Sequence, residues 1–302
     1  MKTFKSFLEG RGISDEIKEY SDFITSLFEN KNDKFQLDLD YGNFPLIDLR
    51  IEYILTDRYH SVCDPSFSSI KKNKLHDILI TIEIDKNNVD LIKIKGILSH
   101  ELTHIKEFFE IQKNIEKTGV DIKPHYIKIR NIYSNLKIDK DKSYYKFIYL
   151  LYLSLDTEMN ARISQVYHYL YELNINDEDD LFEKLKEHQN WKYMEMLNNF
   201  NVDNFIEDNI SEINLEGLIK ITNDLVKKFK QFNLNKHSKL LSFIKDVSNL
   251  DDVKSLYDDF ASYFNKKSEK HIKKFRFIVK EVIEDLNGNR PFNEDYRNKI
   301  KD

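Results

Sequence analysis

Two short segments in the first third of the chain alternate between apolar and polar residues. Within 46–54, every second residue is Ile, Leu or Tyr, and charged residues stand between them. Residues 77–85 repeat the alternation, with isoleucines on one side and polar residues on the other. A period of two is typical of a strand that is buried on one face. We therefore predict two half-buried strands, and the serines and Asp64-Pro65 between them indicate a turn-rich loop over 57–75.

The remainder of the chain shows the spacing of amphipathic helices. Leu98, Leu102, Ile105 and Phe109 recur at intervals of three and four and form one apolar stripe. Only seven glycines and four prolines occur in 302 residues, which favours long helices over tight turns. These patterns predict an α+β protein that is predominantly α-helical, with one small sheet in its N-terminal part. Further helical segments are predicted over 1–30, 147–155, 177–198, 215–232, 251–264 and 268–286.

One stretch, Ser-His-Glu-Leu-Thr-His-Ile at 99–105, indicates a specific chemistry. His100 and His104 are four positions apart, so on a helix they project from the same face, about one turn apart. This spacing lets both imidazoles reach one Zn²⁺ at about 2.0–2.1 Å. Glu101 is placed to take a proton from a water that the metal activates, and Gly96 leaves room for close backbone approach. The alternative is a polar helix edge with two ordinary histidines.

A catalytic zinc site needs a third protein ligand beside the two histidines and an open position for water. Glu158 is the best candidate, because it follows the apolar run 147–155 and would be costly to bury without a partner. Asp156 is the second candidate, since it lies about 200° round the predicted helix, on nearly the opposite face. An ordinary ion pair between Glu158 and Arg162 on a solvated helix face is the alternative.

The His-Glu-Leu-Thr-His helix, followed about fifty residues later by a helix that carries Glu-x-x-Ala, resembles the zincin metallopeptidases of the gluzincin type. The closest overall resemblance is to predicted peptidases of phage type, which have Lys/Ile/Asn-rich sequences. The resemblance covers residues 45–170 and is carried by the two motifs. It implies a zincin-like fold in which His100, His104 and Glu158 bind Zn²⁺ and Glu101 is the general base in peptide hydrolysis.

The resemblance also makes the surroundings of the metal site predictable. Thermolysin-like members carry an aspartate four residues after the ligand glutamate, where it supports a ligand histidine, but here this position is Arg162. In the zincins, a strand before the motif helix forms the sheet edge and binds extended peptides, and 77–85 takes this place. The alternative is that 77–85 is an ordinary core strand. His168 and Tyr167 follow on the same predicted helix and are candidates for stabilising the transition state. Structural roles are the alternative for both.

Composition restricts the partners and the compartment that we expect. The 47 basic and 52 acidic residues nearly balance, which argues against a nucleic-acid partner. The chain has one cysteine, Cys63, so an intramolecular disulfide is impossible and a reducing compartment is expected. The N-terminus lacks the apolar core of a signal peptide, and no run approaches the roughly eighteen apolar residues of a membrane span. These features predict a cytoplasmic protein without a membrane span.

The predicted elements fall into three parts. Residues 1–34 form a helical segment that packs on the catalytic domain, residues 35–175 form the zincin-like metallopeptidase domain, and residues 176–302 form a helical C-terminal domain. A peptide or protein is the expected substrate, and the C-terminal helices are a candidate surface for a protein partner. The second hypothesis is a catalytically inactive zincin-like scaffold or assembly protein, in which a fourth protein ligand would close the metal site.

Overall fold

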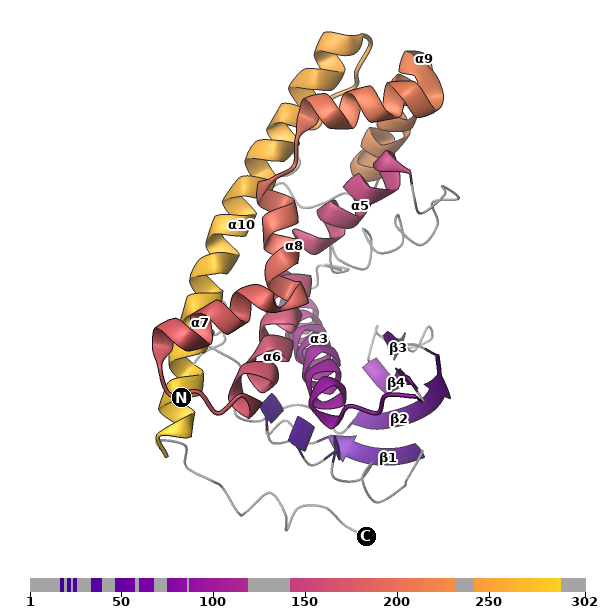
Figure 1. Ribbon diagram of the computed structural model, residues 1–302. Helices are drawn as coiled ribbons and strands as arrows, with labels where there is room; N and C mark the ends of the chain where they lie inside the picture. Colours follow the sequence, from indigo (N-terminus) through magenta and orange to yellow (C-terminus); the bar gives the residue numbers. More distant parts are fainter. Residues whose placement is uncertain are drawn as a thin grey trace.

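A small mixed sheet lies at one end of the molecule, and helices form the rest of it (Figure 1). The helix that carries the histidine motif lies against the sheet, and the longest helix runs along the helical part. The predominantly α-helical α+β class predicted from the sequence is therefore confirmed. This computed structural model describes residues 17–18, 21–22, 24–25, 34–39, 47–57, 60–67, 75–85, 87–118, 142–231 and 242–288.

The described sheet has four strands in the order β1-β2-β4-β3. The predicted strands 46–54 and 77–85 are confirmed as β2 and β4, which pair in parallel, whereas β1 and β3 are antiparallel to their neighbours. Ile80 and Ile82 are buried, while Thr81 between them is only partly buried, as the alternation predicts. The strands are β1 (Lys34–Leu39), β2 (Ile47–Thr56), β3 (His60–Phe67) and β4 (Leu75–Asp85).

Two predictions about the sheet are wrong. β4 is not an edge strand, because it lies between β2 and β3. The segment predicted as a loop contains β3, in which Pro65 pairs in register with Ile78. Proline lacks a backbone N–H and is tolerated in a strand at the edge of a sheet. Turn-forming residues therefore mark an edge strand here, and β3 forms one edge of the described sheet.

Seven helices are described, and several differ in extent from the predicted segments. The predicted segment 177–198 is two helices, because His188 has an extended backbone and its side chain caps the second helix. The segments 251–264 and 268–286 are one continuous helix. The helices are α3 (Leu91–Thr118), α5 (Ser143–Leu153), α6 (Asp156–Glu172), α7 (Glu178–Glu187), α8 (Gln189–Asn198), α9 (Val202–Gln231) and α10 (Leu250–Leu286).

The hydrophobic core is continuous from the sheet to the last helix. Ile82 of β4 and Leu102 of α3 belong to the same buried cluster as Phe147 of α5 and Phe260 of α10. The rings of Phe147 and Phe260 meet edge to face, with their centroids 5.0 Å apart. The proposed boundary at residue 176 stays a prediction, and α10 packs on α6 across it. None of the helices in the described ranges is both long and apolar enough to cross a membrane.

The described residues of the N-terminal segment are helical and contact the rest of the chain. Lys18 is 1% exposed and forms ion pairs with Glu281 at 2.6 Å and Asp285 at 2.9 Å, both on α10. Its ammonium group also lies 4.1 Å from the ring centre of Tyr167 on α6. The remaining residues of the predicted helix 1–30 lie outside the described part. Lys18 thus contacts both the predicted C-terminal domain, through α10, and the predicted catalytic domain, through Tyr167, and packing of the whole segment on the catalytic domain stays a prediction.

Candidate metal centre

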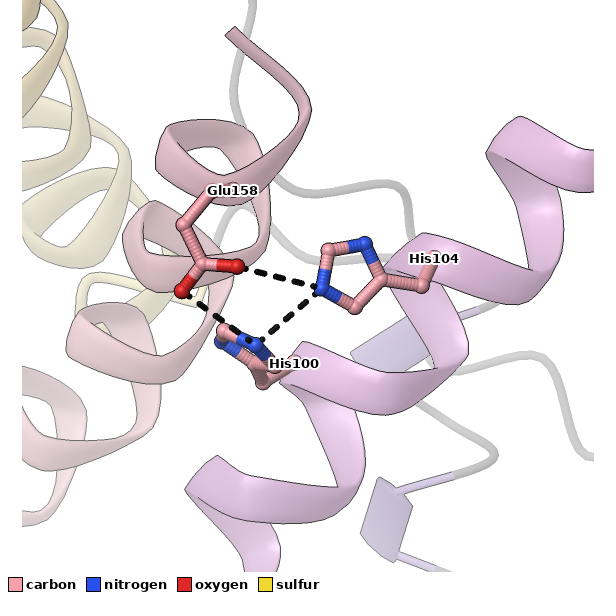
Figure 2. A group of neighbouring side chains, drawn as sticks. All are labelled: His100, His104 and Glu158. Carbon is pink, nitrogen blue, oxygen red and sulfur yellow. Dashed lines mark hydrogen bonds and ion pairs between the residues drawn. The ribbon is translucent and has the colours of Figure 1, made fainter. Parts of the chain in front are cut away.

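Three side chains that are candidate metal ligands meet between α3 and α6. His100 and His104 project from α3, Glu158 projects from the first turn of α6, and the three point toward one another (Figure 2). Nε2 of His104 lies 3.2 Å from Nε2 of His100 and 3.6 Å from Oε2 of Glu158. Nε2 of His100 lies 3.9 Å from the other carboxylate oxygen. Among the described residues, this is the group of His, Cys, Asp and Glu side chains that could hold a metal ion.

The distances between these atoms fit a tetrahedral zinc ion. Ligands at about 2.0–2.1 Å from zinc are separated from each other by about 3.3 Å in a tetrahedron. The two imidazole nitrogens are 3.2 Å apart, and each lies within 3.9 Å of one oxygen of Glu158, so small shifts would place both nitrogens and one carboxylate oxygen around one ion. Two imidazoles and one carboxylate are a donor set of catalytic zinc sites. The residues present therefore fit the metal that the motif implies.

Small residues let α3 and α6 approach closely enough to share a site. A Cβ atom on Gly96 would lie 3.1 Å from Cγ and 3.2 Å from the carbonyl oxygen of Gln165 on α6. The hydroxyl of Ser164 lies 2.9 Å from that of Thr103 and 3.0 Å from the carbonyl oxygen of Ser99. Ser164 and Thr103 are buried, and the hydroxyl of each has a hydrogen-bond partner. The close approach predicted at Gly96 is confirmed.

The environment keeps the site in the protonation state that a metal needs. Burial lowers the pKa of His100 to about 3, against the opposing effect of the Glu158 charge. Burial alone would raise the pKa of Glu158, but the charge of Arg162 and the contacts with the two histidines outweigh it, so this pKa lies well below its usual range. At neutral pH the site thus offers an uncharged His100 and an ionised carboxylate, the forms that coordinate metal ions.

Glu158 is 0% exposed, and both of its carboxylate oxygens have partners. Nη2 of Arg162 lies 2.6 Å from Oε1, and the hydroxyl of Tyr152 donates a hydrogen bond to Oε2. The alternative predicted for Glu158 is therefore half correct, since the ion pair with Arg162 forms but is buried rather than solvated. Burial raises the pKa of Tyr152 well above its usual value, and the nearby charge of Glu158 adds to the shift. The phenol thus remains a donor across the neutral range.

Glu101 lies beside the ligand group, where the sequence predicts the general base. Its side chain is 5% exposed, and the hydroxyl of Ser61 on β3 donates a hydrogen bond of 2.5 Å to its Oε1 atom. The charge of Glu101 also contributes to the raised pKa of Tyr152. The hydrogen bond from Ser61 ties the proposed base on α3 to strand β3.

Three other candidate residues lie outside this group. Asp156 faces α10, where it forms ion pairs with Lys267 at 2.9 Å and Lys270 at 3.0 Å. The hydroxyl of Tyr167 donates a hydrogen bond to Asp285 on α10. His168 is buried ten positions after Glu158 on α6, which corresponds to about 15 Å along the helix axis. The geometry thus brings Glu158 rather than Asp156 to the histidines, and it places neither Tyr167 nor His168 beside them.

Tyr152 and Ser61 are the neighbours of the site that the sequence analysis missed. Tyr152 stands six residues before Glu158, on a different helix, so no helical periodicity connects the two. Ser61 lies in the segment predicted as a loop. A tyrosine within the apolar run 147–155 was the one available signal, because a buried phenol usually has a hydrogen-bond partner.

Comparisons with known proteins leave the function to be argued from this geometry. No protein-family model, curated protein or solved structure matches the chain. The likeness to gluzincins therefore rests on the residues of the two motifs, and the described structure brings these residues together. The structure establishes that the site is a buried His-His-Glu group that could hold a metal ion.

Proposed function

We propose that this chain is a zinc-dependent metallopeptidase with a zincin-like, gluzincin-type catalytic domain. The observation that carries the proposal is the convergence of His100, His104 and Glu158 at one buried point, and the buried Glu101 follows His100 directly in the chain. Three protein ligands are the number found in catalytic zinc sites, where a fourth position stays open. The peptide bond is the proposed substrate because a carboxylate base next to a His-x-x-x-His pair is the arrangement of metallopeptidases.

The chain's own residues supply binding, orientation and proton transfer. When bound, zinc supplies a Lewis acid that polarises the substrate carbonyl and makes water more acidic. Glu101 accepts the proton of the attacking water and returns it to the departing amine. Ser61 donates a hydrogen bond to Oε1 of this carboxylate and so restricts the orientation of the general base. Burial of Glu101 and Glu158 keeps bulk water away and strengthens these interactions.

An extended peptide substrate is expected to bind along β3. In the described part of the sheet, β3 pairs with β4 on one side and lies at the edge. Added strands form main-chain hydrogen bonds with such an edge. Ser61 links β3 to Glu101, so a peptide on β3 would be held near the proposed base. This proposal moves the substrate-binding edge from 77–85 to residues 60–67.

Metal content and cleavage of a peptide library together test the proposed function. The purified, untagged protein should contain about one zinc per chain, and His104→Ala should lose it. Glu101→Gln should keep the zinc and lower cleavage by about 10²- to 10⁴-fold, because it removes the base alone. Zinc-loaded protein that cleaves no peptide, or a Glu101→Gln variant with full activity, would contradict the mechanism.

An inactive zincin-like scaffold is the second candidate, and one observation favours it. Arg162 and Tyr152 already bind both oxygens of Glu158, so the buried carboxylate has partners without any metal. A protein that takes up no zinc on titration, or that binds zinc through a fourth side chain, would support this candidate. Against this candidate, the group among the described residues contains three possible zinc ligands and no fourth.

A further inference from the structure

The nearest cation to the proposed ligand carboxylate comes from its own helix. Arg162 follows Glu158 by one turn of α6, and its Nη2 atom lies 2.6 Å from Oε1. The carboxylate is fully buried and the arginine side chain is 14% exposed, so water screens this pair weakly. The Oε1 atom that Arg162 contacts lies 3.9 Å from Nε2 of His100, and Oε2 lies 3.6 Å from Nε2 of His104. The guanidinium thus holds one oxygen of the carboxylate in place relative to the two histidines.

Arg162 is itself held in place by α8. Its Nη1 atom donates a hydrogen bond of 3.2 Å to Oδ1 of Asn190, and its guanidinium lies 4.6 Å from the ring centre of Tyr193. The amide of Asn190 can point only one way, since its Nδ2 atom donates to the backbone carbonyl of Arg162 at 3.1 Å. Its Nδ2 atom also donates to the side-chain oxygen of Gln165 at 3.2 Å. Each of these contacts restricts the guanidinium to one position.

We infer that Arg162 is a positioning residue for Glu158 and that α8 supports the metal site through it. The inference rests on the proposed metal centre and names the part of the chain that sets its ligand geometry. The ion pair at Oε1 and the hydrogen bond from Tyr152 at Oε2 together restrict the rotation of the carboxylate. A carboxylate that cannot rotate loses less entropy when it binds a metal.

Outer partners of metal ligands commonly change metal affinity by about 10- to 100-fold when they are removed. Arg162→Leu is therefore expected to weaken zinc binding within this range. Arg162→Lys keeps the charge beside Glu158 but cannot also reach Asn190 with a planar fork, so it should restore the affinity in part. Tyr193→Leu leaves the ion pair intact and removes the ring beneath the guanidinium, so the affinity should fall by about two- to fivefold.

The experiment measures zinc dissociation constants of the full chain at pH 7, in competition with a chromophoric chelator. The visible absorption of the Co²⁺-loaded protein reports coordination geometry, which a purely structural residue would leave unchanged. Arg276→Leu is the matched control, because Arg276 also lies over an aromatic ring, that of Phe182 at 5.2 Å, and is exposed on α10. Circular dichroism identifies any variant that fails to fold, and Tyr193→Leu then carries the test.

The expected result is weaker zinc binding and an altered Co²⁺ spectrum in Arg162→Leu, partial recovery in Arg162→Lys, and no change in Arg276→Leu. Unchanged or tighter zinc binding in folded Arg162→Leu would overturn the inference and leave the proposed metal centre standing. The inference is equally overturned if Arg162→Leu does not fold and Tyr193→Leu binds zinc like the wild type. A wild-type chain that binds no zinc would remove both the proposed function and this inference.

Discussion

Ser61 of β3 donates a 2.5 Å hydrogen bond to Glu101 of α3 and so connects the edge of the sheet to the proposed general base. The two residues are forty positions apart in the sequence and belong to different types of secondary structure. The bond ties the orientation of the carboxylate to the strand on which a peptide substrate is expected to bind. Substrate binding and base orientation therefore depend on the same strand.

Ser61→Ala should lower kcat by about tenfold while zinc content stays at the wild-type level. The variant removes a hydrogen bond to a charged group, which contributes about 1.5–3 kcal/mol, and part of this is recovered by water. Ser61→Thr keeps the hydroxyl and serves as the control. Steady-state cleavage of the best library peptide, beside zinc analysis, provides the measurement. Equal kcat values for the alanine and threonine variants would show that the hydroxyl has no role.

Tyr152→Phe should weaken zinc binding by about tenfold, because the phenol no longer holds Oε2 of Glu158. Tyr171→Phe is a suitable control, since Tyr171 stacks on a ring in the same way but lies thirteen positions after Glu158 on α6, about 20 Å along the helix axis. Chelator competition at pH 7 compares the two variants. If both bind zinc like the wild type, the bond from Tyr152 does not orient the ligand.

Gly96→Ala should lower the free energy of unfolding by about 1–3 kcal/mol through overpacking of α3 against α6. Alanine alone would favour the helix by about 1 kcal/mol, but its Cβ would lie 3.2 Å from the carbonyl oxygen of Gln165. The obstacle includes backbone, so relief requires a shift of α6 and of the ligand that it carries. Urea denaturation of the metal-free protein measures the effect. A gain in stability would show that the two helices separate at no cost.

Acid should destabilise the protein partly through His188. Its Nδ1 atom accepts a hydrogen bond of 3.1 Å from the backbone N–H of Asn190, which requires a neutral ring. Burial lowers the pKa of His188 to about 4, and the charge of Arg162 adds to the shift. The unfolded chain, with a histidine pKa of about 6.5, therefore binds this proton first, so the stability is complete above that pH and falls between about pH 6.5 and 4.

His188→Asn should reduce this loss of stability, because asparagine caps helices well and does not titrate. The difference in slope between the two proteins is at most about 1.4 kcal/mol per pH unit, the value for one proton. Urea denaturation at pH 7.5, 6, 5 and 4 gives both slopes, and the value at pH 7.5 controls for the loss of the ring. Parallel slopes would mean that His188 is protonated at no cost in the folded state.

Lys18→Met should lower the free energy of unfolding by about 3–5 kcal/mol, because it leaves Glu281 and Asp285 without their buried cation. Asp285→Asn in the same background should recover part of the loss by removing one of the two carboxylates that lose the cation. Chemical denaturation of the single and double variants forms a double-mutant cycle. An additive cycle would indicate that the ion pair contributes nothing to stability.

Periodicity predicted the parts of the fold that depend on local sequence. The alternation in 77–85 and the apolar stripe around Leu102 correspond to β4 and α3, because burial on one face selects those patterns. Strand β3 escaped prediction because Pro65 and its polar neighbours resemble a loop and are tolerated at an edge. Strand order cannot be deduced from periodicity at all, which is why β4 was expected at the edge.

The site was predictable where chemistry follows from spacing or from the cost of burial. The histidine pair follows from a four-residue interval, and Glu158 follows from its position after an apolar run. The two partners of Glu158, Tyr152 and Arg162, could not be predicted in the same way, because their contacts depend on other helices. Tyr152 approaches from α5, and the ion pair of Arg162 is buried only because α8 covers it. Such contacts depend on tertiary packing, which no interval along the sequence encodes.

The ion pairs of Lys18 form late in synthesis, because the lysine is made long before its partners. Its two carboxylate partners follow it by 263 and 267 residues, so they leave the ribosome long after it does. At 5–20 residues per second, roughly 13–53 s separate the synthesis of the lysine from that of its first partner. Throughout this interval the ammonium group must stay in water, because burial without a partner is costly. Lys18 is therefore made well before Glu281 and Asp285 and reaches its buried position only after them.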